Sequence, residues 1–309
     1  MTEQNPNPIL VAVGHDPMEP ALAWAAAEVE RLSCGLHLLH VVHLLARGPE
    51  LSLGDEVHLQ QVGRKLLDAA LRQARALVAE GVPVTADLAM GAVVPALVEA
   101  TRGDARMVVV QHRHLSRTRR AITRSVASGV AAHARVPVVA VSSTWSPDGG
   151  TTRTVTVGVD VADRSAEVLR TAADAAASRA ATLRIVHTWD YPATYDDVLP
   201  VDVDSDDWTS RAVSEITRAL EPLSEHLDGV PVQIDAGRAR AADVLLEASA
   251  HSDLLVVGRH DPLVPVGSHL GPVARAVLRE SHCPVLLADP HPARWHRRRP
   301  PSAAAAAHE

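Results

Sequence analysis

Short apolar runs alternate with longer amphipathic stretches along almost the whole chain. In the first half, apolar runs predict strands at 9–13, 36–42, 82–88, 107–110 and 138–141, and helical spacing predicts helices at 21–32, 57–80, 94–101 and 122–134. In the second half, the same order recurs, with strands at 154–160, 182–188, 231–235, 253–258 and 284–288 and helices at 164–179, 209–228, 241–251 and 272–282. Strands that alternate with helices are typical of a parallel sheet with helices on both faces.

The two halves of the chain repeat one unit. A shift of 147 residues places Val110 on Val257, and a shift of 146 places Gly91 on Gly237, each of which is expected to open a helix. We therefore predict two α/β domains, domain 1 at 1–143 and domain 2 at 154–289. The segment 144–153, rich in Ser, Pro and Gly, is expected to be a linker, and the Pro-, Arg- and Ala-rich tail at 290–309 is expected to be disordered.

The composition narrows the class of protein. With 47% hydrophobic and 22% charged residues, the chain is typical of a globular protein, and its net charge of -7 argues against a general affinity for nucleic acid. The first residues lack the features of a signal peptide, and no apolar run approaches the ~20 residues of a membrane span, so we expect a cytoplasmic protein without a membrane partner. Cys34 and Cys283 lie in different domains, which favours two reduced core thiols.

The end of the second half carries a spaced glycine motif. An apolar run ends at Gly258, Gly271 follows 13 residues later, and Pro284 opens another apolar run after 13 more. This spacing resembles the universal stress protein family, whose nucleotide-binding members carry a glycine, two residues, a second glycine, nine residues and then glycine with Ser or Thr. The resemblance covers nearly the whole chain as two tandem domains.

The resemblance implies a doubly wound α/β fold. Each domain is expected to be a five-stranded parallel sheet of order 3-2-1-4-5, and the two domains are expected to pair at their fifth strands, 138–141 and 285–288, as an internal pseudo-dimer. An exposed apolar edge strand would otherwise be a liability. A homodimer of the whole chain is a further option.

The resemblance also implies a site for ATP or another adenine nucleotide in domain 2. Its residues would be Asp160, Val186, Gly237, Gly258, Arg259, Gly267, Ser268 and Gly271. Two departures oppose phosphate binding: Asp261 replaces the second glycine, and Pro272 replaces the Ser or Thr, which removes an N–H and a hydroxyl. Gly267 and Ser268 are four residues out of register. The alternative role for Asp160 is to cap the following turn.

Domain 1 departs further from the family motif. Gln111, His114 and Arg124 replace the three glycines, and Gly14 replaces the acid that ends the first strand, so we expect no ATP there. The loop around these residues is strongly basic, with Arg113, Arg117, Arg119, Arg120 and Arg124. This loop is interpreted either as a solvated charged segment or as a docking site for an anion or a protein partner.

No pattern of catalytic or metal-ligating residues emerges. The chain has 17 histidines, but the nearest groupings, His112 with His114 and His291 with His296, lack the spacing of a zinc site. The sequence therefore predicts a stress-linked, non-catalytic ligand sensor or interaction protein, whose protein partner it does not identify. The alternative is an ATP-binding switch or a slow ATPase that uses domain 2.

Overall fold

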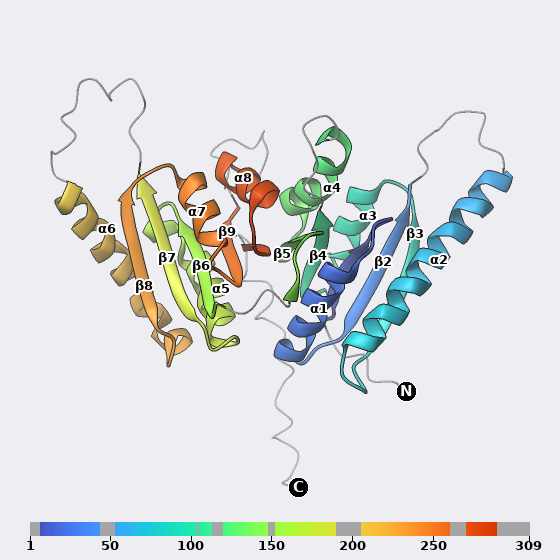
Figure 1. Ribbon diagram of the computed structural model, residues 1–309, viewed down its shortest axis with the longest axis horizontal. Coiled ribbons are helices and arrows are strands. Elements are labelled where there is room, and N and C mark those ends of the chain that lie inside the picture. Colours follow the sequence, from blue (N-terminus) through green and yellow to red (C-terminus); the bar gives the residue numbers. More distant parts are fainter. Residues whose placement is uncertain are drawn as a thin grey trace, which may run out of the picture.

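The computed structural model describes residues 7–43, 53–103, 105–112, 120–147, 152–189, 205–259 and 270–288. Their strands form one ten-stranded sheet of order β3-β2-β1-β4-β5-β10-β9-β6-β7-β8. Each half has the predicted order 3-2-1-4-5, because β10, β9, β6, β7 and β8 correspond to the fifth, fourth, first, second and third strands of domain 2. The long helices α2 and α6 lie at the two outer ends of the molecule (Figure 1).

In domain 1, the elements follow the predicted alternation closely. They are β1 Ile9–Val13, α1 Glu19–Leu32, β2 Leu36–Val42, α2 Leu53–Leu77, β3 Val84–Met90, α3 Val93–Ala100, β4 Met107–His112, α4 Arg120–His133 and β5 Val138–Ser142. All strand pairs within this half are parallel.

In domain 2, the same order returns with two short 3-10 helices. The elements are β6 Thr154–Val159, η2 Ala162–Arg164, α5 Ala166–Ala177, β7 Thr182–Trp189, α6 Ser205–Leu220, η4 Glu221–Leu227, β8 Val232–Arg238, α7 Ala241–Ser249, β9 Leu254–Gly258, α8 Pro272–Glu280 and β10 Val285–Ala288. The prediction that Gly237 opens a helix is wrong, because β8 stays paired with β7 as far as Arg238 and α7 begins only at Ala241.

The two halves meet at their fifth strands, as predicted. β10 pairs with β5 in antiparallel register, with Val285 opposite Ala140, Leu286 opposite Val139 and Leu287 opposite Val138. Every side chain of both strands is buried. The two expected five-stranded sheets are thus one continuous sheet, because this ladder satisfies the backbone groups that either edge would otherwise expose.

Alternate strand residues fill two cores, one on each face of the sheet. Ile9 and Val11 pack on the face covered by α1 and α2, and Leu10 and Val108 pack on the face covered by α3 and α4. With no Phe in the chain, the packing relies on Val, Leu, Ile and Ala. Both cysteines are free and buried, as predicted, and burial raises the pKa of Cys283 to about 12.

A buried ion pair also links the domains. Arg179, just after α5, donates from Nη2 to Oε2 of Glu28 on α1 at 2.5 Å, and the two side chains are only 7% and 5% exposed. Arg31 donates to the same carboxylate oxygen at 3.0 Å.

Among the helices of the described residues, none combines the length and the apolar character of a membrane span.

Candidate functional site

Ligands of open α/β sheets bind at the carboxyl ends of the parallel strands. In both domains, a histidine of the second strand forms a hydrogen bond with the last carbonyl of the first strand at this edge. His40 on β2 contacts the carbonyl oxygen of Val13 through Nδ1 at 2.8 Å, and His187 on β7 contacts that of Val159 at 3.0 Å. A carbonyl can only accept, so both Nδ1 atoms carry the proton. Sequence reasoning missed this pair, although the repeat shift of 147 places the two histidines on each other.

In domain 2, three predicted site residues gather at this edge. Asp160 is exposed directly after β6, and η2, which follows it, begins without a side-chain cap. Gly258 ends β9, where an added Cβ would lie 3.0 Å from Cγ2 of Val168. Gly271 is the N-cap of α8 and has an extended backbone, with φ -67 and ψ 170. The arrangement brings a carboxylate, a strand-end glycine and a helix N-terminus to one edge.

Pro272 is the first residue of α8. Proline suits this position, because its fixed φ is already helical and the first N–H of a helix has no partner within the helix. The next N–H groups, of Val273 and Ala274, also lack acceptors within the helix. The substitution therefore removes one donor and the family's hydroxyl while keeping the helix N-terminus, which favours anions, at this edge.

The other predicted residues of domain 2 lie elsewhere or are differently engaged. The Val186 side chain is 3% exposed in the core, and Gly237 sits within β8 with open space around its α carbon. Arg259 follows Gly258, but its guanidinium donates to the carbonyl oxygens of Ala134 and Val136 in domain 1. Asp261, Gly267 and Ser268 fall outside the described residues.

In domain 1, a half-buried side chain stands at the equivalent position of the edge. Gln111, at the position of Gly258, donates from Nε2 to the carbonyl oxygen of Pro17 at 2.8 Å and accepts at Oε1 from the Ala21 N–H at 3.3 Å. The amide thereby ties β4 to the start of α1, across the place where the glycine of the motif would leave room.

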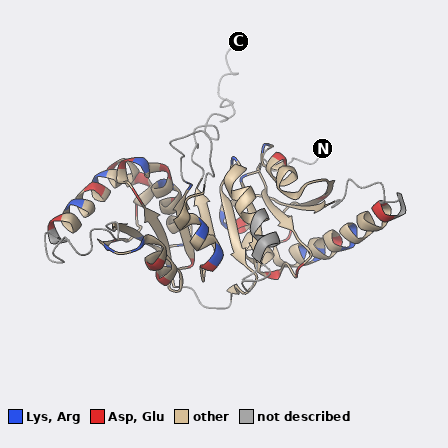
Figure 2. Cartoon of the chain, turned by 90° about the horizontal axis from the view of Figure 1, so that it is seen from above, with Lys and Arg blue, Asp and Glu red and all other residues tan. Residues whose placement is uncertain are grey.

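The basic loop predicted in domain 1 is only partly covered. Arg113, His114, Arg117 and Arg119 fall outside the described residues, and for Arg120 and Arg124 the structure describes only the backbone, which lies in α4. Elsewhere, positions of Lys and Arg (blue) and of Asp and Glu (red) mix along the helices at the two ends of the molecule (Figure 2). The anion or partner site of this loop therefore stays a prediction.

His40 makes the stability of the protein dependent on pH. Burial lowers the pKa of His40 below its ordinary value of 6.5, the hydrogen bond to Val13 raises it in part, and His15, whose ring lies 5.5 Å away, lowers it further. The folded state therefore binds this proton less readily than the unfolded chain. The contribution of neutral His40 to the stability of the folded state is therefore fully present above pH 6.5 and is lost as the pH falls below that value.

We expect His40→Gln, whose amide can still donate to the Val13 carbonyl, to flatten the fall in the free energy of unfolding as the pH drops below 6.5. Urea unfolding at a series of pH values measures this slope. Some slope should remain, because burial also lowers the pKa of His37. Parallel pH profiles for the variant and the wild type would contradict the role of His40.

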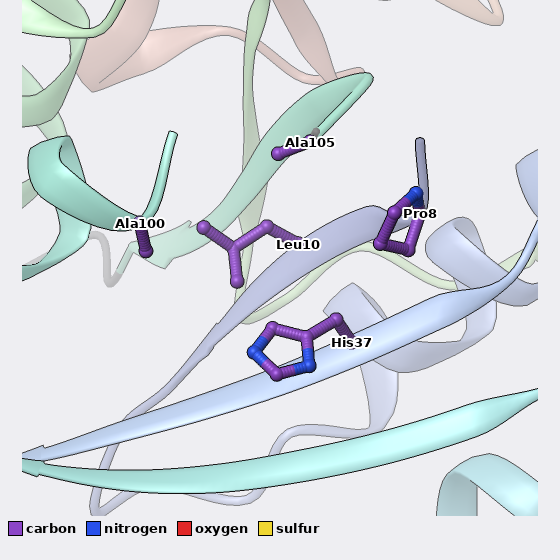
Figure 3. Close-up of a pocket in the computed structure, with 5 residues that line it drawn as sticks. All are labelled: Pro8, Leu10, His37, Ala100 and Ala105. Carbon is purple, nitrogen blue, oxygen red and sulfur yellow. The ribbon is translucent and has the colours of Figure 1, made fainter. Parts of the chain in front are cut away.

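A pocket of about 280 Å³ lies at the opposite end of the domain 1 strands. It is lined by Pro8, Leu10, His37, Ala100 and Ala105 (Figure 3). The imidazole of His37 forms a hydrogen bond with the Thr85 hydroxyl, which lies 2.8 Å from Nδ1. None of the predicted site residues lines this pocket, so it is separate from the carboxyl edge.

The sequence matches a family model and several known proteins. A family model described as the universal stress protein family matches the chain twice, over residues 6–142 and 151–289. Universal stress protein Rv1996 of Mycobacterium tuberculosis (strain ATCC 25618 / H37Rv) is 26% identical over 305 residues, which cover 91% of this chain and 94% of the relative. Universal stress protein Rv2623 of the same strain is 28% identical over 300 residues, covering 91% and 95%.

A solved structure shares the arrangement of the whole chain. The crystal structure of a universal stress protein from Archaeoglobus fulgidus DSM 4304 has a TM-score of 0.67 at 15% identity, and the match covers 91% of this chain and 96% of that one. At this identity, the likeness concerns the fold alone.

Proposed function

Since this chain belongs to the universal stress protein family, we propose that it is a non-catalytic ligand sensor or interaction protein of the stress response that binds an adenine nucleotide weakly, in domain 2 alone. The observation that carries this proposal is the contrast between the two carboxyl edges. In domain 1, the Gln111 side chain stands at the edge and bonds to Pro17 and Ala21. In domain 2, Gly258 stands at the same position without a side chain.

Domain 2 retains groups suited to both ends of a nucleotide. Asp160 is exposed after the first strand of the domain, where an acid of the family contacts the adenosine moiety. The N-terminus of α8 offers backbone N–H groups and the positive end of a helix dipole to a phosphate. These groups lie at one edge, which supports a single ligand that spans them.

Domain 2 should bind the phosphate end of a nucleotide more weakly than the adenosine end. Asp261 brings a negative charge to the motif, and like charges 4 Å apart repel by ~1 kcal/mol in water and ~4 kcal/mol at an effective dielectric constant near 20. Pro272 removes one N–H and one hydroxyl. We therefore infer weak binding with little preference for ATP over ADP or AMP.

Calorimetric titration of the full chain with ATP, ADP and AMP tests this proposal. The double variant Asp261→Gly with Pro272→Ser should tighten ATP about tenfold or more and leave AMP less changed, because it removes a charge near the phosphates and restores donors. Asp160→Asn is the control for the adenosine end, and it should weaken ATP and AMP alike.

Three outcomes would contradict the proposal. Micromolar binding of ATP by the wild type, with AMP far weaker, would favour an ATP-binding switch. Phosphate release that stops in Asp160→Asn would favour a slow ATPase in domain 2. Nucleotide-dependent spectral shifts confined to residues 111–125 would place the site in domain 1 instead.

A further inference from the structure

Arg259 connects the carboxyl edge of domain 2 to domain 1. It follows Gly258 directly, and its guanidinium donates from Nη1 to the carbonyl oxygen of Ala134 and from Nη2 to that of Val136 at 2.6 Å. Both carbonyls come just after α4. The Ala134 carbonyl directly follows the helix, where carbonyls lack partners within the helix and carry partial negative charge, so a cation is well held there. The Val136 carbonyl supplies a second acceptor for the same guanidinium.

The antiparallel ladder between the domains explains why Arg259 can reach these carbonyls. Leu287 near the end of β10 pairs with Val138 at the start of β5, and Ala288 pairs with Gly258 at the end of β9. The residues that lead into β5 therefore lie beside the carboxyl ends of β9 and β10. The end of α4 in domain 1 is thus a neighbour of the candidate ligand edge of domain 2.

We propose that Arg259 is a positioning residue for the ligand site of domain 2. It holds the carboxyl end of β9 against domain 1, so that ligand binding in domain 2 depends on the docking of domain 1. This inference rests on the proposed function for its ligand. It assigns Arg259 a role through the domain interface, in place of the direct nucleotide contact expected from sequence.

The two ends of the interface are not equivalent. In the repeat, Val136 corresponds to Cys283, and the Cys283 carbonyl already accepts from the Ser281 hydroxyl of its own domain at 2.8 Å. Arg259 corresponds to His112, whose shorter imidazole replaces the forked guanidinium. Domain 2 therefore has both features: Gly258 at the end of its fourth strand and Arg259, which links this edge to domain 1.

The ion pair between Arg179 and Glu28, which also links the domains, supplies a matched control. Arg179 precedes β7 and so lies at the amino edge of domain 2, away from Arg259. The variant Arg179→Met with Glu28→Gln removes a cross-domain pair without touching the carboxyl edge. Arg259→Met removes the donors but keeps an apolar stem, and Arg259→Lys keeps the charge with a single point of contact.

Hydrogen exchange of the ligand-free full chain tests the anchoring itself. In Arg259→Met, amides at 134–138 and 270–274 should exchange about fivefold faster or more than in the wild type, with a smaller change in Arg259→Lys and none in the Arg179 and Glu28 control. If Arg259→Met fails to fold, Arg259→Lys takes its place. Equal rates in the wild type and the Arg259 variants would overturn the inference.

Calorimetric titration with ATP tests the consequence for the ligand. Arg259→Met should bind ATP about fivefold more weakly or worse, whereas the control should stay within about twofold of the wild type. Unchanged affinity in Arg259→Met would overturn the inference. If the wild type takes up no adenine nucleotide, the proposed function is contradicted, and the ligand-free exchange rates alone support or overturn the anchoring.

Discussion

Replacing Val139 by aspartate should lower the free energy of unfolding by about 3 kcal/mol or more, because an unpaired carboxylate would be buried at the joint between the domains. Val139 is 0% exposed. It lies in β5 between Val109 of β4 and Leu286 of β10. The charge would therefore weaken both the core of domain 1 and the ladder that makes one sheet of two domains.

Urea unfolding measures this loss, and the chain offers a matched control. Val232→Asp makes the same chemical change on β8, an outer strand, where the side chain is 38% exposed. It should cost about 1 kcal/mol or less. Gel filtration should show self-association of Val139→Asp, because separated fifth strands expose apolar edges. Similar losses in the two variants would contradict a central role for the ladder.

Replacing Arg179 by methionine should lower the free energy of unfolding by about 3 kcal/mol, because the Glu28 carboxylate then stays buried with Arg31 as its one remaining cationic partner among the described residues. Burial lowers the pKa of Arg179, and the neighbouring Glu28 raises it in part, so the cation depends on this partner. Removing both charges, in Arg179→Met with Glu28→Gln, should restore the stability to within about 1 kcal/mol of the wild type.

The control for this cycle is an ion pair at the surface. Arg102 contacts Glu99 at 2.5 Å, but the side chains are 54% and 67% exposed. Arg102→Met should change the free energy of unfolding by about 0.5 kcal/mol or less, because water screens exposed charges. If Arg179→Met cost no more than Arg102→Met, the buried pair would not contribute to joining the domains.

Much of the fold was predictable because its causes are local. Apolar runs of four to seven residues mark buried strands, helical spacing marks the covering helices, and the repeat reveals two copies of one unit. The pairing of the fifth strands was also predictable, because 138–141 and 285–288 are apolar throughout and would be a liability if exposed. The place of Gly237 was not predictable, because the length of β8 depends on its partner β7 rather than on the glycine.

The candidate site was predictable to a smaller extent. The sequence showed that domain 1 lacks the glycines of the family motif and that Gln111 occupies one of their positions. The hydrogen bonds of this amide to Pro17 and Ala21 were not predictable. They form only when α1 packs beside β4, which lies about 90 residues further along the chain. The places of Asp160 and Gly258 followed from the strand ends, since these form one edge of a parallel sheet.

By itself, the sequence determined the two domains, the order of their elements and which domain retains glycines of the family motif, because these follow from local patterns and from the repeat. Only the tertiary structure decided which side chains link the domains beside the paired fifth strands. Arg179 and Glu28 are 151 positions apart, and Arg259 and Ala134 are 125 apart. No periodicity links such residues, because their contact arises only when two folded units dock through an antiparallel ladder.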